Sequence, residues 1–69
     1  MNNEITTYRE HEGLSQGELA ESVGVSRQTV NAIERDRYDP SLELAFKLAV
    51  YFDCRIEDLF QPDIEPVGE

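Results

Sequence analysis

The apolar residues of this chain recur with the period of amphipathic helices, and runs that alternate apolar and polar residues, as strands do, are absent. This spacing predicts a first helix over about residues 3–12, which ends at Gly13, a residue that readily adopts a left-handed conformation. A second helix opens at Ser15, where Glu18 three positions later completes a capping box, and it stops at Gly24.

A third helix is predicted to begin after Ser26, whose hydroxyl is a good N-cap, and to turn Val30 and Ile33 toward the core. It ends near Asp36, where we expect a left-handed conformation that glycine would adopt more easily. Two short helices around a glycine turn allow one helix to pack on the protein while the next lies in the major groove of DNA. The sequence therefore predicts a helix-turn-helix.

After Pro40 breaks the chain, a fourth helix is predicted over about residues 42–52. This segment is apolar apart from Glu43 and Lys47, so the helix either is central in the core or meets a partner. A short fifth helix over about residues 56–60 follows. The predicted fold class is an all-α, five-helix, repressor-like helix-turn-helix domain.

The length of 69 residues allows one domain, assigned to residues 1–61, with residues 62–69 as an acidic C-terminal tail. A core and a walled catalytic cleft do not both fit, so we expect no enzyme. No spacing of His, Cys, Asp and Glu matches a metal site and no glycine-rich phosphate loop is present, so no metal, cofactor or small-molecule ligand is expected. No apolar run approaches the roughly 20 residues that span a bilayer, and the N-terminus lacks the features of a signal peptide. We therefore expect a cytoplasmic protein.

The charge balance runs against nucleic-acid binding. Fifteen acidic residues and six basic ones give a formal net charge of −9, whereas DNA-binding domains usually present a basic face. Three arginines, however, lie in and just after the third helix: Arg27, Arg35 and Arg37. High acidity with a single lysine, Lys47, favours a halophile's cytoplasm, where salt screens the repulsion between like charges.

Specific residue types stand at the positions that two crossing helices require. Counting Gln16 as the first motif position, alanine falls at the fifth, glycine at the ninth, and β-branched residues at the fifteenth and eighteenth. These positions, together with the segments GVSRQTV from Gly24, YDPSL from Tyr38 and IEDLF from Ile56, resemble the XRE-type helix-turn-helix family of phage repressors and Cro proteins. The resemblance covers about residues 3–61. It implies five helices, DNA binding as a dimer and control of transcription.

Carried over by position, the resemblance directs four side chains toward base edges. Arginine can contact guanine through two hydrogen bonds, and glutamine can contact adenine in the same way, which assigns these roles to Arg27 and Gln28. Asn31 would read a further base, and Ala32 would touch a thymine methyl group. The alternative for these residues is an ordinary solvated helix face.

Further residues are candidates for contacts with phosphate. Gln16 stands at the start of the second helix, where free backbone N–H groups also favour an anion. The complete set is Gln16, Ser26, Thr29, Arg35, Arg37 and Tyr38. Alternatively, Arg35 and Arg37 only screen nearby acids, and Tyr38 is a packing residue.

The resemblance also implies a buried ion pair between Arg9 and Glu34, which would link the first helix to the reading helix. Two positions depart from the family pattern. Asp36 stands where glycine is usual and places a negative charge beside the phosphate contacts. Arg55 stands where many relatives have a serine or threonine cap, so we expect the last helix to start poorly.

The last two helices carry more apolar residues than one small core needs. We therefore expect part of these two helices to pair two subunits, with the reading helices about 34 Å apart, one turn of DNA. The predicted interface comprises Tyr51, Phe52, Ile56, Leu59 and Phe60.

Together these observations predict a sequence-specific transcriptional regulator that binds double-stranded DNA as a homodimer, with residues 27–35 in the major groove. The alternative is a protein-binding adaptor on the same fold, similar to an antitoxin or a coactivator. The acidic surface and the apolar end of the chain favour the adaptor, and the arginines of the third helix favour DNA.

Overall fold

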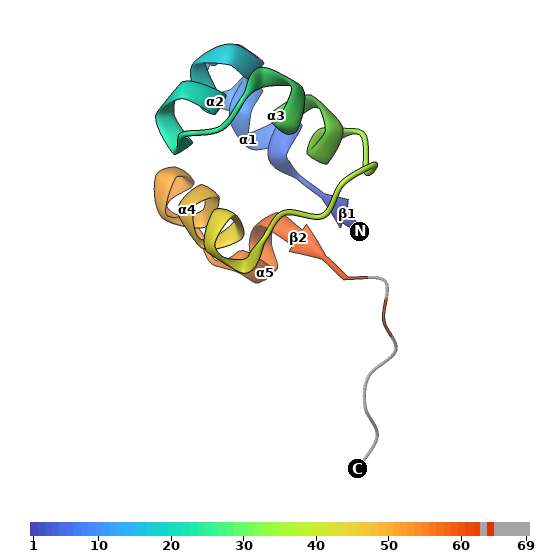
Figure 1. Ribbon diagram of the computed structural model, residues 1–69. Helices are drawn as coiled ribbons and strands as arrows, with labels where there is room; N and C mark the ends of the chain where they lie inside the picture. Colours follow the sequence, from blue (N-terminus) through green and yellow to red (C-terminus); the bar gives the residue numbers. More distant parts are fainter. Residues whose placement is uncertain (63, 65–69) are drawn as a thin grey trace.

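The computed structural model describes residues 1–62 and 64 of the chain. The five predicted helices are present, and two very short strands bracket them (Figure 1). The elements are β1 Asn2–Asn3, α1 Ile5–His11, α2 Gln16–Val23, α3 Arg27–Glu34, α4 Leu42–Phe52, α5 Ile56–Leu59 and β2 Phe60–Gln61. No helix within these residues is long and apolar enough to cross a membrane. Of the predicted acidic tail, residues 63 and 65–69 lie outside the described part.

The strands β1 and β2 form an antiparallel pair in which Asn3 lies opposite Phe60, so the two ends of the helical domain meet (Figure 1). The sequence predicted a helix from residue 3, but α1 begins at Ile5. The Asn3 side chain accepts the Ile5 N–H at 3.1 Å, and its amide donates to the Ile33 carbonyl at 2.8 Å. Two-residue strands are too short to produce the alternating pattern by which strands are recognised.

Local signals set the helix ends. Ser15 and Glu18 form the predicted capping box, with hydrogen bonds of 2.8 and 3.0 Å. Gly24 closes α2 in the left-handed conformation, at φ 78°, and Asp36 follows α3 at φ 64°, as predicted. Asp53 also has a left-handed φ, 56°, at the end of α4, which the sequence analysis did not anticipate.

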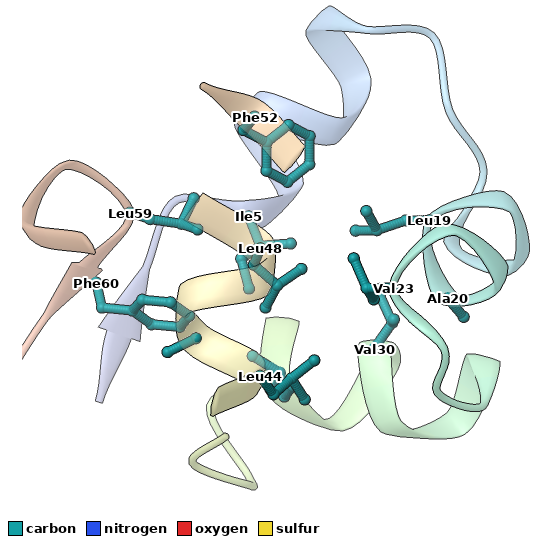
Figure 2. Packing of buried hydrophobic residues seen from close by; sticks show 12 residues of the cluster. Ile5, Leu19, Ala20, Val23, Val30, Leu44, Leu48, Phe52, Leu59 and Phe60 are labelled. Carbon is teal, nitrogen blue, oxygen red and sulfur yellow. The ribbon is translucent and has the colours of Figure 1, made fainter. Parts of the chain in front are cut away.

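The inner side of α4 forms the centre of the core (Figure 2). Leu48, which is 1% exposed, lies between the α2–α3 pair and the segment formed by α5 and β2. The packed cluster consists of Ile5, Leu19, Ala20, Val23, Val30, Ile33, Leu44, Ala45, Leu48, Phe52, Leu59 and Phe60. The cluster fixes α2 and α3 against the rest of the domain and so determines the direction in which α3 faces.

Three residues of the predicted dimer interface belong to this core. Phe52, Leu59 and Phe60 are 8%, 0% and 4% exposed within a single chain. The prediction that they pair two subunits is corrected, because so short a chain buries only about 60% of its surface and uses these side chains to complete its own core. Tyr51 is exposed and Ile56 is half-buried.

The start of α5 is better capped than expected. Arg55 provides no acceptor at the N-cap, but the Asp58 carboxylate accepts the Arg55 backbone N–H at 3.1 Å. The same carboxylate lies 3.6 Å from the Arg55 guanidinium. These contacts, the backbone hydrogen bond first, lower the pKa of Asp58. The missing serine or threonine is therefore compensated from the third position of the helix.

Candidate nucleic-acid interface

Helix α3 packs against α2 with its apolar side inward and its polar side toward solvent. Val30 and Ile33 are each 2% exposed. At the start of the helix the Ser26 hydroxyl accepts the Thr29 N–H at 3.1 Å. At its end the Asn3 amide donates to the Ile33 carbonyl at 2.8 Å, which also accepts the Asp36 N–H at 3.0 Å. Side chains thus hold both ends of α3, and its outer side stays accessible.

The side chains predicted to contact bases fall into two groups. Arg27 and Gln28, on the first turn of α3, are exposed, whereas Asn31 and Ala32, one turn later, are half-buried. Arg27 lies beside the start of α2, since a Cβ atom on Gly17 would be 3.7 Å from Arg27 Cδ. The first turn of α3 therefore presents two long, polar side chains that are free to contact a ligand.

The predicted phosphate contacts of this region lie at both ends of α3. Arg35, Arg37 and Tyr38 follow α3 and are all exposed, while Ser26 is exposed and Thr29 half-buried beside it. In the described part of the chain neither Arg27 nor Arg35 nor Arg37 has an acidic partner. Their positive charges are therefore available to an anionic ligand.

The acidic residues near these arginines have a partner of their own. The N-terminal ammonium of Met1 lies 3.0 Å from the Asp36 carboxylate and 3.5 Å from that of Asp39. This contact partly compensates the negative charge that the sequence places beside the predicted phosphate contacts.

At the last residue of α3 an ion pair joins this helix to α1. Arg9 Nε donates to Glu34 Oε2 at 2.7 Å and Arg9 Nη2 to Glu34 Oε1 at 3.3 Å, while Nη1 donates to the Leu14 carbonyl at 2.8 Å. The two side chains are 13% and 5% exposed. Such a two-pronged contact fixes geometry as well as charge, so it sets the position of α3 relative to α1.

The pKa values of this pair follow from its contacts. Burial by itself raises the pKa of Glu34, but hydrogen bonds from Arg9, Gln16 and Thr6 outweigh it and lower the pKa below 4.5. The hydrogen bond to Glu34 raises the pKa of Arg9. Both groups are therefore charged at neutral pH.

Gln16 and Asn31 belong to the same hydrogen-bond network. Gln16 Nε2 donates to Glu34 Oε1 at 2.9 Å, and Asn31 Nδ2 donates to Gln16 Oε1 at 3.3 Å. Each amide nitrogen keeps a second N–H group, because a side-chain amide carries two donors. Gln16, a predicted phosphate contact, and Asn31, a predicted base contact, are thus bonded to each other, and Gln16 is also bonded to the Glu34 carboxylate of the buried ion pair.

One contributor was not found from the sequence. Asn3 contacts the end of α3 from a strand in a segment where the sequence predicted a helix. An asparagine before a first helix is too common to identify this role.

An exposed helix that carries arginine and glutamine, held across a glycine turn by the preceding helix, defines a helix-turn-helix domain. The family model described as helix-turn-helix matches residues 5–59, and the chain belongs to this family. The predicted XRE-type resemblance is confirmed. An uncharacterized HTH-type transcriptional regulator of Methanocaldococcus jannaschii is 53% identical over 60 residues, covering 87% of this chain and 91% of the relative. The uncharacterized HTH-type regulator YgzD of Bacillus subtilis is 48% identical over the same shares of each chain.

Solved structures agree with this assignment. The restriction-modification controller protein C.AhdI from Aeromonas hydrophila is similar with a TM-score of 0.73 at 36% identity, over 81% of each chain. SinR, a master regulator for biofilm formation solved in complex with DNA, is similar with a TM-score of 0.70 at 33% identity, over 77% of this chain and 86% of SinR. The fold is therefore that of DNA-binding regulators.

Proposed function

We propose that this protein is a sequence-specific transcriptional regulator that places α3 in the major groove of double-stranded DNA and binds as a dimer. The observation that carries the proposal is the first turn of α3, where Arg27 and Gln28 are exposed and have no partner within the described residues, while a buried ion pair anchors the other end of the helix. A rigid support of this kind keeps the entropy cost low when the side chains contact bases. The similarity to SinR, which was solved with DNA, supports the same reading.

The exposed pair provides the primary base contacts in this proposal. Arg27 donates two hydrogen bonds to a guanine and Gln28 pairs with an adenine, each at its major-groove edge. Ala32 contacts a thymine methyl group. Asn31 uses its second N–H for a further base, and its bond to Gln16 fixes the direction in which that N–H points.

Phosphates on both sides of the groove orient the domain. Gln16 donates its remaining N–H from the start of α2, where free backbone N–H groups add to the attraction. Ser26 and Thr29 contribute hydroxyls at the start of α3, and the residues after it complete the clamp. Those residues are Arg35, Arg37 and Tyr38.

The net charge of −9 reduces the share of affinity that comes from counterion release. We therefore assign a larger share of binding to base contacts than is usual, as a cytoplasm with high salt would require. On this view the chain carries no catalytic activity and needs no cofactor.

The test is selection of bound duplexes from a random pool at several KCl concentrations. The wild type should enrich a symmetric sequence with two half-sites about one helical turn apart. The double variant Arg27→Ala, Gln28→Ala should keep its helical content and lose the enrichment. Arg55→Ala is the matched control, because it removes an exposed arginine outside α3, and it should enrich the wild-type sequence.

If the wild type enriches no sequence at any salt concentration, the proposal fails. The protein would then be better explained as a protein-binding adaptor, a function that the acidic surface also favours.

A further inference from the structure

The outer side of α4 is apolar although nothing in the described part of the chain covers it. Leu42, Phe46 and Val50 follow one another at intervals of four residues and are 70%, 54% and 77% exposed. Tyr51 beside them is 41% exposed. We call these four residues the α4 stripe. A helix that is apolar on both sides needs a cover for the second side, and the domain core uses only the first.

A groove runs along this stripe. It has a volume of about 780 Å³ and lies between α4 and the last turn of α2. Glu43, Phe46, Lys47, Val50 and Tyr51 form one wall, and residues 21–24 form the other. All of the α4 stripe except Leu42 therefore borders a concavity into which side chains of another helix fit.

The charges beside the stripe form a weak pair. Glu43 and Lys47 stand one turn apart, with 3.8 Å between Lys47 Nζ and Glu43 Oε2, and their side chains are 82% and 54% exposed. An exposed pair at this distance contributes little to the stability of the helix. Both groups can exchange their partner at little cost.

We propose that a second copy of this chain covers the α4 stripe, with the two α4 helices antiparallel about a two-fold axis near Phe46. Leu42 and Val50 are each four residues from Phe46, so Leu42 of one copy then lies opposite Val50 of the other. Such an arrangement buries Leu42, Phe46 and Val50 of each copy on the other, while Tyr51 lies on the flank that carries Lys47.

Charge complementarity favours a second copy over a different partner. A two-fold axis perpendicular to both helices leaves Glu43 of one copy on the same flank as Lys47 of the second copy. The two residues are then offset by about 3 Å along the helix axis, within the reach of a lysine side chain. The two-fold axis generates this contact twice, because Lys47 of the first copy likewise lies near Glu43 of the second copy. The same surface on both copies therefore supplies the acidic and the basic partner. Elsewhere the two chains, each with a net charge of −9, repel one another.

This interface differs from the one that the sequence predicted. It shares Tyr51 with that set, but it replaces the buried Phe52, Leu59 and Phe60 by the opposite side of the preceding helix. The inference rests on the proposed function in one respect, since a symmetric DNA site requires a two-fold dimer.

The experiment measures the dimerisation constant of the full chain by sedimentation equilibrium at fixed KCl. Wild type should dimerise in the micromolar range, because four partly exposed side chains form less than a standard interface of about 800 Å² per partner. Val50→Lys should weaken dimerisation about tenfold or more. Ile64→Lys is the matched control, since Ile64 is 75% exposed outside the stripe and the substitution introduces the same positive charge in place of an aliphatic side chain. It should leave the constant unchanged.

A charge exchange tests the two-fold geometry. Glu43→Lys alone brings lysines together across the axis and should weaken dimerisation. The double variant Glu43→Lys, Lys47→Glu restores the pairing and should recover most of the loss. A double variant no tighter than the single one, or a Val50→Lys chain that dimerises like wild type, overturns the proposal.

Binding to duplexes with one or two half-sites separates this inference from the proposed function. The stripe variants should bind a single half-site with wild-type affinity and lose affinity only for the symmetric site. A wild-type dimer that selects no DNA refutes the function and leaves the interface standing. A wild-type chain that remains monomeric up to hundreds of micromolar refutes the interface, and the stripe then serves a different protein.

Discussion

The outer sides of α3 and α4 are both exposed, but they present opposite chemistry. The first turn of α3 carries arginine and glutamine, and a buried ion pair anchors the other end of this helix, whereas the α4 stripe carries aliphatic and aromatic side chains above an apolar core. Water solvates the α3 side chains well and the α4 stripe poorly. An anionic ligand that binds the α3 surface must displace water from it. Association through the α4 surface is favourable because it removes that surface from water.

The two surfaces also differ in their support. Hydrogen bonds from Asn3, Gln16 and Arg9 reach α3 from three other elements. Helix α4 is held mainly by apolar contacts such as those of Leu48. Directional bonds fix the orientation of a helix, while apolar packing is less directional. Substitutions that remove hydrogen bonds should therefore affect mainly the orientation of α3. Substitutions that change buried apolar area should affect mainly α4.

The largest effect is expected from removing the support of α3. Arg9→Ala leaves the Glu34 carboxylate, 5% exposed, without its partner, and should lower the free energy of unfolding by about 3 kcal/mol or more. Urea denaturation followed by circular dichroism measures this loss. Arg55→Ala, at an exposed pair, should leave the midpoint unchanged. Equal effects of the two substitutions would show that the Arg9–Glu34 pair does not anchor α3.

Acid should weaken the same support. Because the pKa of Glu34 is lower in the folded chain than its ordinary value of 4.5, the unfolded chain binds more protons near that pH. The contribution of Glu34 is complete above about pH 5.5 and is lost as the pH falls through 4.5 toward the lower folded pKa. Urea midpoints measured across this range should fall less steeply for Glu34→Gln than for wild type. A parallel pH dependence would contradict the assignment.

Salt should act oppositely on the two surfaces. Raising KCl from about 0.1 M to 1 M shortens the screening length from about 10 Å to 3 Å. The repulsion within a chain of net charge −9 then weakens, so thermal stability and dimerisation should both increase. DNA affinity should decrease, because releasing counterions from the phosphates into a more concentrated salt solution gains less free energy. Stability that stays constant or falls with KCl would exclude adaptation to a halophile's cytoplasm.

The smallest effect is expected where α2 meets Arg27. A Cβ atom on Gly17 would find ordinary contacts, 3.7 Å from Arg27 Cδ and 3.9 Å from Ser15 Oγ. Gly17→Ala should therefore stabilise the domain by about 0.5 kcal/mol through the lower entropy of the unfolded chain. Thermal melting measures the gain. A loss of stability would mean that Arg27 is packed more tightly than the distances indicate.

The helix ends and the reading turn could be predicted because their causes are local. Ser15 with Glu18, Ser26 before α3 and Asp36 after it act through backbone groups within a few residues. The pairing of β1 with β2 and the contact of Asn3 with Ile33 join residues far apart in the sequence. A periodic pattern contains no information about such contacts.

Whether an apolar residue lies in the core or on the surface also depends on contacts between segments that are far apart in the sequence. Both sides of α4 are apolar, so its pattern left open which side faces inward. The core was completed by Leu59 and Phe60 from the end of the chain, and this decided that the Leu42 side of the helix stays exposed. The predicted interface treated Phe52, Leu59 and Phe60 as apolar surface beyond the needs of the core, whereas the core buries all three.

The sequence by itself determined five helices, the glycine turn and the polar first turn of α3, because capping, periodicity and backbone conformation are short-range effects. Only the tertiary structure decided that Gln16 and Asn31 hold one another, that Asn3 secures the end of α3 and that one side of α4 stays uncovered. These features depend on which distant segments compete for the same core and the same hydrogen-bond partners. That competition is resolved when the whole chain packs.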